Sequence, residues 1–112
     1  RMMEITGNAP GWIAAGTYSA VTNYLKAVEK AGTDDAAAVL KAMQEIEIKD
    51  FFVQNGELYP NGRLIHDMYL LEVKKPDEVK EKDDLLKLAA TVPAKEAYRP
   101  YEATACKVKL GE

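Results

Sequence analysis

Residues 14–32, AAGTYSAVTNYLKAVEKAG, carry the clearest helical pattern in the chain. Four larger side chains recur at steps of three and four, which predicts that they form the buried face of one amphipathic helix: Tyr18, Val21, Leu25 and Val28. Gly32 is predicted to end this helix, because glycine adopts the left-handed conformation of a C-terminal cap without a steric penalty. We therefore expect the rest of the chain to pack around this helix.

The residues just before this helix are predicted to be extended. Gly11 and Gly16 flank the apolar run of residues 12–15, which is typical of a short buried strand. A strand followed by Gly16-Thr17 and a helix has the form of a strand-to-helix turn, and ligands of open α/β sheets bind at such turns. Tyr18 then lies in the first helical turn. Its ring either points into a cleft or, as the periodicity alone favours, begins the helical core.

The length and composition indicate one small domain. The 112 residues allow a single modest core. The net charge is −3 and the lysines are interleaved with acidic residues, so no basic surface of the kind that binds nucleic acids is predicted. No apolar run reaches the length of a membrane span. The chain opens on Arg1, and residues 1–6 have the pattern of the end of a helix. We therefore expect a fragment of a longer protein, without its signal peptide.

A second helix is predicted directly after Gly32. Thr33 is expected to cap it with its hydroxyl, and the two aspartates that follow favour the positive end of the helix dipole. Its predicted buried face contains Ala36, Val39, Leu40, Met43 and Ile46. The connection is so short that the two helices should pack as a hairpin.

The middle of the chain predicts β-structure. Residues 46–53 are β-prone, and Asn55-Gly56 and Asn61-Gly62 are turn signals that can supply the positive φ angles of tight hairpins. Residues 64–73 are the longest strand candidate, and apolar side chains on both faces predict a buried strand.

The last third of the chain is less regular. The charge-rich residues 77–84 predict a solvated loop or helical turn. Residues 85–92 alternate and predict another strand. Pro93 is expected to begin a short helix that reaches Tyr98, because proline fits the first helical position. The tail after Pro100 is predicted to be irregular.

The chain lacks the residue patterns of a standalone enzyme. His66 and Asp67 are adjacent on a predicted strand, so alternation sends their side chains to opposite faces and predicts no catalytic dyad. We expect His66 to have a structural or hydrogen-bonding role. Cys106 is the only cysteine, which excludes an internal disulfide. It is either a free thiol or the partner of a cysteine outside this chain. No metal-ligand spacing and no phosphate-binding loop is present, so no cofactor is expected.

Several stretches together resemble the C-terminal region of ABC-transporter solute-binding proteins of the branched-chain amino acid type. The first two are GTYSAV at residues 16–21 and YLKAVEKAGTDD at residues 24–35. The later ones are NG at 55–56, NGR at 61–63, HDMYL at 66–70, ATVP at 90–93 and AYRP at 97–100. The resemblance covers essentially the whole chain, with agreeing spacing.

This resemblance implies an α/β fold, namely part of a type I periplasmic binding protein fold. In that fold two Rossmann-like lobes, joined by hinge strands, close on a small solute. The chain then forms a single partial domain, 1–112. Residues 1–50 are the helical part of the N-terminal lobe, residues 51–73 a hairpin and return strand, and residues 74–112 a C-terminal extension.

The resemblance also implies ligand contacts and partners. A binding tyrosine at the start of this helix in many family members aligns with Tyr18, which favours a cleft position for its ring. Ala15, Gly16 and Thr17 are then neighbouring backbone in the site. The implied solute is a branched-chain amino acid or, from the ATVP and AYRP stretches, an aromatic carboxylate. The implied partner is an ABC-transporter permease, the implied location is the periplasm, and no enzymatic activity or membrane insertion is implied.

Two functions remain open at this stage. The chain is part of the solute-binding component of an ABC importer, or it is a ligand-sensing or interaction module of a receptor that uses the same fold. In either case the isolated chain is expected to expose apolar helix and strand surfaces. We therefore expect it to self-associate.

Overall fold

The structure is a computed structural model that describes residues 2–106. The helices are α1 (Met2–Thr6), α2 (Trp12–Ala31), α3 (Ala36–Glu45) and α4 (Ala94–Ala97), with short 3₁₀ helices η1 (Pro76–Glu78) and η2 (Tyr101–Ala103). The strands are β1 (Glu57–Leu58), β2 (Leu64–Ile65), β3 (Met68–Val73) and β4 (Leu86–Val92).

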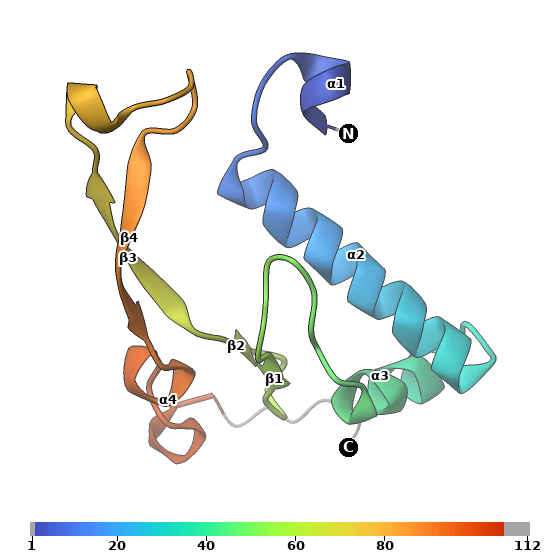
Figure 1. The fold of residues 1–112 in the computed structure, drawn as a ribbon. Coiled ribbons are helices and arrows are strands. Elements are labelled where there is room, and N and C mark those ends of the chain that lie inside the picture. Colours follow the sequence, from blue (N-terminus) through green and yellow to red (C-terminus); the bar gives the residue numbers. More distant parts are fainter. Residues whose placement is uncertain (1, 107–112) are drawn as a thin grey trace.

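Two long arms flank the β1–β2 hairpin and the loop that precedes it (Figure 1). One arm is α2, and the other is the antiparallel pair of β3 and β4. The radius of gyration is 17.3 Å, whereas a compact domain of this length has a radius of about 13 Å. Both arms therefore leave much apolar side-chain surface exposed.

The predicted helical hairpin is confirmed. Helices α2 and α3 pack against each other through a small core of Ala27, Val39 and Ala42. Gly32 ends α2 in the left-handed conformation, with φ at 66°, as predicted. The cap of α3 differs from the prediction: Asp35 accepts a hydrogen bond from the Ala38 backbone N–H at 3.0 Å, and this replaces the expected cap by Thr33.

The buried face of α2 is not the one that the periodicity predicted. Ser19, Asn23 and Ala27 are buried, because α3 and the loop after it pack on this side of the helix. The side chains of Tyr18, Val21 and Leu25 are 60%, 52% and 58% exposed, so the prediction that they form the core was wrong. Val28 alone of the predicted set packs against the core, where it is partly buried.

The predicted strand at residues 12–15 was also wrong. Helix α2 begins at Trp12, and the Ala15 N–H donates to the Gly11 carbonyl at 3.1 Å, which is a helical hydrogen bond. A four-residue apolar run fits a strand or a helix equally well, and here it joins the longer helical pattern that follows. Gly16 and Thr17 therefore lie inside a helix and not in a strand-to-helix turn.

Residues 46–56 form a loop that rests on α2, where β-structure was predicted. Its only ladder contact within the described chain is an isolated bridge between Ile48 and Gly56. Gly56 does not have a positive φ angle, contrary to the turn prediction. It is needed for close packing, because a Cβ atom there would lie 2.7 Å from Ile48 Cγ2 and 2.8 Å from Val53 Cγ1.

The second turn signal is confirmed. Strands β1 and β2 form a short antiparallel hairpin, and Gly62 in its turn has a φ angle of 81°. The predicted strand at residues 64–73 is divided into β2 and β3 at His66-Asp67. All residues of β3 are exposed, so its predicted burial is not observed in the described part of the chain.

The remaining elements agree with the sequence. The pattern of residues 1–6 corresponds to α1, residues 85–92 to β4, and Pro93 precedes α4. The charge-rich segment contains η1 and loops, and the tail contains η2. The predicted tail beyond residue 106 lies outside the described residues.

Two matched substitutions test the observed burial. Val39→Ala should lower the free energy of unfolding by about 2 kcal/mol, because both buried methyl groups are lost and a cavity remains. Val21→Ala removes the same atoms from a position that is 52% exposed, and should change stability by less than about 0.5 kcal/mol. Urea unfolding followed by circular dichroism measures both values, and equal losses would contradict the observed packing.

Candidate functional site

One cavity of the described chain lies between the start of α2, the loop at residues 50–53 and the junction of β2 and β3. Its volume is about 810 Å³, within the range of small-molecule sites. Aromatic and apolar side chains dominate its lining, which includes Trp12, Thr17, Phe51, Phe52, His66 and Tyr98. Such a surface favours a ligand with an apolar body and a few polar groups.

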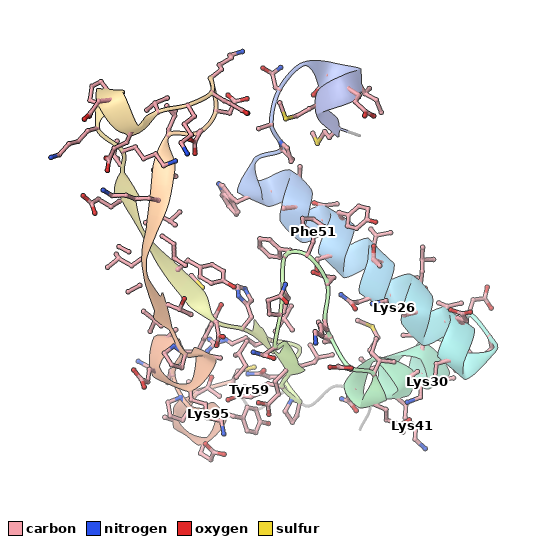
Figure 2. The ribbon with its side chains drawn as sticks, viewed as in Figure 1. Lys26, Lys30, Lys41, Phe51, Tyr59 and Lys95 are labelled. Atoms are coloured by element: carbon pink, nitrogen blue, oxygen red, sulfur yellow. The ribbon has the colours of Figure 1, made fainter. Side chains whose placement is uncertain are left out.

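A second, smaller cavity of about 490 Å³ lies beside α1 and the start of α2. The four predicted ligand residues divide between the two cavities. Gly16 and Thr17 line the larger one, whereas Ala15 and Tyr18 line the smaller one. Phe51 lines both, and Figure 2 shows it at the tip of its loop beside α2. The Tyr18 and Phe51 rings pack in a T-shaped arrangement, with centroids 5.3 Å apart.

Gly16 leaves free space in the wall of the larger cavity. A Cβ atom at this position would meet only the Phe52 ring, at 3.9 Å, which is ordinary van der Waals contact. Glycine inside a helix costs about 1 kcal/mol relative to alanine. The packing of the described residues therefore does not require glycine here, and the absent side chain enlarges the cavity.

The loop that carries both phenylalanines is fixed by Asp50. One carboxylate oxygen, Oδ2, accepts hydrogen bonds from Ser19 Oγ at 2.6 Å and from Asn23 Nδ2 at 2.9 Å, both on α2. The other, Oδ1, accepts from the backbone N–H groups of Phe52 at 2.8 Å and Val53 at 2.9 Å. Sequence reasoning missed Asp50 as a site residue. The available signal was an aspartate that can accept from the backbone two and three residues later.

This environment perturbs the titration of Asp50. Desolvation is the largest single effect and raises its pKa, but the hydrogen bonds from Ser19, Val53, Phe52 and Asn23 together outweigh it and lower the pKa below its usual value. A lowered pKa in the folded state means that the ionised carboxylate stabilises the fold above the unfolded-state pKa. This contribution is lost as the pH falls through the folded-state pKa.

His66 and Asp67 use their polar atoms in separate hydrogen bonds. Asp67 Oδ1 accepts from the Ala94 N–H at 3.0 Å, at the start of α4. His66 Nδ1 lies 2.8 Å from the Asp67 carbonyl oxygen, and His66 Nε2 lies 3.5 Å from the Tyr98 hydroxyl. The predicted hydrogen-bonding role of His66 is therefore confirmed, and its ring also contacts Phe52, with centroids 5.7 Å apart.

Other chemical features of the described chain are few. Among residues 2–106, no cluster of three or more histidine, cysteine, aspartate or glutamate side chains could hold a metal ion. Cys106 is an exposed free thiol. None of the helices within these residues is long and apolar enough to cross a membrane.

Comparison with known proteins identifies the family. A family model described as periplasmic binding protein matches residues 1–80. The chain belongs to the periplasmic binding protein family. The α/β fold that the sequence resemblance implied, part of the type I periplasmic binding protein fold, is thereby confirmed.

Two solved structures have the same fold over almost the whole chain. One is a periplasmic binding protein from Burkholderia mallei, which is 40% identical with a TM-score of 0.88. The other is a branched-chain amino acid ABC transporter periplasmic ligand-binding protein from Burkholderia xenovorans LB400, which is 35% identical with a TM-score of 0.90. Each match covers 95% of this chain, and the chain spans 28% of the length of each relative. The comparison with curated proteins gave no match.

Proposed function

We propose that this chain supplies one wall of the solute site in an extracytoplasmic binding protein of an ABC importer. The observation that carries the proposal is the aromatic-lined cavity of about 810 Å³ at the start of α2. Family membership supports a binding role in place of catalysis. The Asp67 carboxylate and the His66 ring each have hydrogen-bonding partners of their own, so they do not form a catalytic pair with each other. The proposed location is the periplasm, and the proposed partner is a transporter permease.

The lining of the cavity favours a small solute with an apolar body. Trp12, Phe51 and Phe52 offer flat apolar surface, while Thr17 offers a hydroxyl group. A branched-chain amino acid fits this description, as does an aromatic carboxylate. The similarity to the Burkholderia xenovorans protein, a branched-chain amino acid ABC transporter ligand-binding protein, supports the first class.

We further propose that residues 15–18 contact the solute. Ala15 and Tyr18 lie on one side of Phe51, and Gly16 and Thr17 on the other. The exposed ring of Tyr18 leaves it accessible to a ligand, and the missing side chain of Gly16 leaves room for one. Residues 1–50 would then belong to one lobe of the binding protein, and residues 51–73 would lead toward the hinge.

A chimera tests the solute site directly. This chain replaces the matching segment of the Burkholderia xenovorans protein, and calorimetry measures the binding of L-leucine and of benzoate. We expect one of the two to bind, and Tyr18→Ala should weaken that binding by about 1–3 kcal/mol, the cost of losing a buried aromatic contact or a hydrogen bond.

Tyr24→Ala is the matched control, since Tyr24 lies on the same helix and is 44% exposed. It lines neither of the two cavities described above. Equal affinity of the Tyr18→Ala and unsubstituted chimeras would remove Tyr18 from the site. A folded chimera that binds neither compound would contradict the proposed solute classes.

We also propose that the isolated chain associates with further copies of itself. The exposed side chains of Val21 and Leu25 on α2 and of Leu70 and Leu71 on β3 form apolar surface on both arms. The pair of β3 and β4 also has two open strand edges, which favour pairing with another chain.

Light scattering over a concentration series measures this association. We expect the mass to rise above that of one chain as the concentration increases. A constant monomeric mass at high concentration, together with one cooperative unfolding transition, would show that the chain remains single.

A further inference from the structure

We propose that Asp50 is the positioning residue of the solute site, because its carboxylate fixes Phe51 and Phe52 at the places where they line the cavities. The inference rests on the proposed function and adds to it the group that shapes the aromatic wall. Asp50 itself does not line either cavity. It acts through the two residues that follow it in the chain.

The first step of the argument is that Asp50 joins two separate elements. Its Oδ2 atom accepts from Ser19 and Asn23, which are 2% and 4% exposed on α2. Its Oδ1 atom accepts from the backbone of the loop itself. Hydrogen bonds to a charged acceptor are about twice as strong as neutral ones, and these are shielded from water on the side of the helix.

The second step is that the bonds leave little freedom for the loop. The Asp50 N–H donates to the Val53 carbonyl at 2.7 Å, and Gln54 Nε2 donates to the Asp50 carbonyl at 2.8 Å. The turn between residues 50 and 53 is therefore closed by both the backbone and the carboxylate. Phe51 and Phe52 lie within this turn, so their rings leave it in fixed directions.

The third step is that these directions place the two rings on different neighbours. The Phe51 ring packs against the Tyr18 ring in a T-shaped arrangement, and the Phe52 ring approaches the His66 ring with centroids 5.7 Å apart. Val53, which is 1% exposed, ends the turn close to Gly56, where an added Cβ atom would lie 2.8 Å from Val53 Cγ1. The hydrogen bonds of Asp50 with Ser19 and Asn23 join the turn to the middle of α2.

The Asp50→Asn variant distinguishes the attachment of the turn to α2 from the formation of the turn itself. Asparagine keeps an oxygen that can accept from Phe52 and Val53, but it places an NH₂ group against the NH₂ group of Asn23. The turn should form, while its tether to α2 is weakened, because Ser19 and Asn23 lose their charged acceptor. Ser19→Ala is the milder variant, since it removes one donor of the tether and leaves Asp50 unchanged. Asp77→Asn is the control for the loss of charge, since Asp77 is exposed on η1.

The readout is nuclear Overhauser contacts between the rings of the 112-residue chain. We expect the Phe51–Tyr18 and Phe52–His66 contacts in the unsubstituted chain and in Asp77→Asn. In Asp50→Asn both should be lost, while circular dichroism still reports folded helices. If Asp50 has only a structural role, the variant unfolds more readily but keeps both contacts in its folded population, and this result overturns the inference. If Asp50→Asn does not fold, weakened contacts in folded Ser19→Ala support the inference and unchanged contacts overturn it.

Solute binding gives the second readout. In the chimera, Asp50→Asn should weaken binding about tenfold, because the aromatic wall is displaced while its side chains are retained. A chimera that binds neither L-leucine nor benzoate contradicts the proposed function alone, since the ring contacts of the free chain still decide the role of Asp50. Ring contacts that persist in Asp50→Asn, with unchanged affinity, contradict the positioning role alone.

Discussion

The carboxylate of Asp50, held against α2 by Ser19 and Asn23, is the interaction on which the arrangement of this structure depends. The apolar core between α2 and α3 is small, because Ala27, Val39 and Ala42 contribute few carbon atoms. It fixes the far end of α2 and does not extend to the start of the helix. The loop at residues 46–56 is joined to the middle of α2 by the hydrogen bonds of Asp50, and it carries the phenylalanine side chains that line the two cavities.

This arrangement explains why a helix can present its larger side chains to solvent. A charged acceptor pairs with the donor groups of two buried polar side chains of α2 at once, and burial of those donors without partners would be costly. Once that face is covered, Tyr18, Val21 and Leu25 necessarily point elsewhere. Exposed apolar surface of this kind marks binding or interaction sites in soluble proteins, and here it lies on a chain that spans 28% of the length of its solved relatives.

Local features of the fold were predictable from the sequence. The helical periodicity located α2 and α3, Gly32 located the end of α2, and Asn61-Gly62 located the β1–β2 turn. These signals act over a few residues, so no tertiary information is needed to interpret them. The choice of the buried helical face was not predictable in the same way. Periodicity shows which residues share a face, but the partner that covers a face is set by residues distant in the sequence, here Asp50.

In the candidate site, too, local features were predictable from the sequence and contacts between distant residues were not. The resemblance to solute-binding proteins selected residues 15–18 at the start of α2, and the structure places all four in the walls of two neighbouring cavities. The resemblance could not show that Phe51 lines both cavities, because this depends on how the loop turns over the helix. The prediction that residues 12–15 form a strand failed because a four-residue apolar run has no period of its own. The break at His66-Asp67 was also missed, and there the Asp67 carboxylate accepts a hydrogen bond from the Ala94 N–H, 27 residues away in the sequence.

Titration of the Asp50 carboxyl group by nuclear magnetic resonance tests the central claim most directly. Four hydrogen bonds to the ionised carboxylate should keep the pKa of Asp50 below the ordinary aspartate value of about 3.9. Ser19→Ala removes the shortest of these bonds and should raise the pKa toward the ordinary value. An Asp50 pKa at or above the ordinary value in the folded chain, unchanged by Ser19→Ala, would show that the carboxylate does not hold the loop to α2.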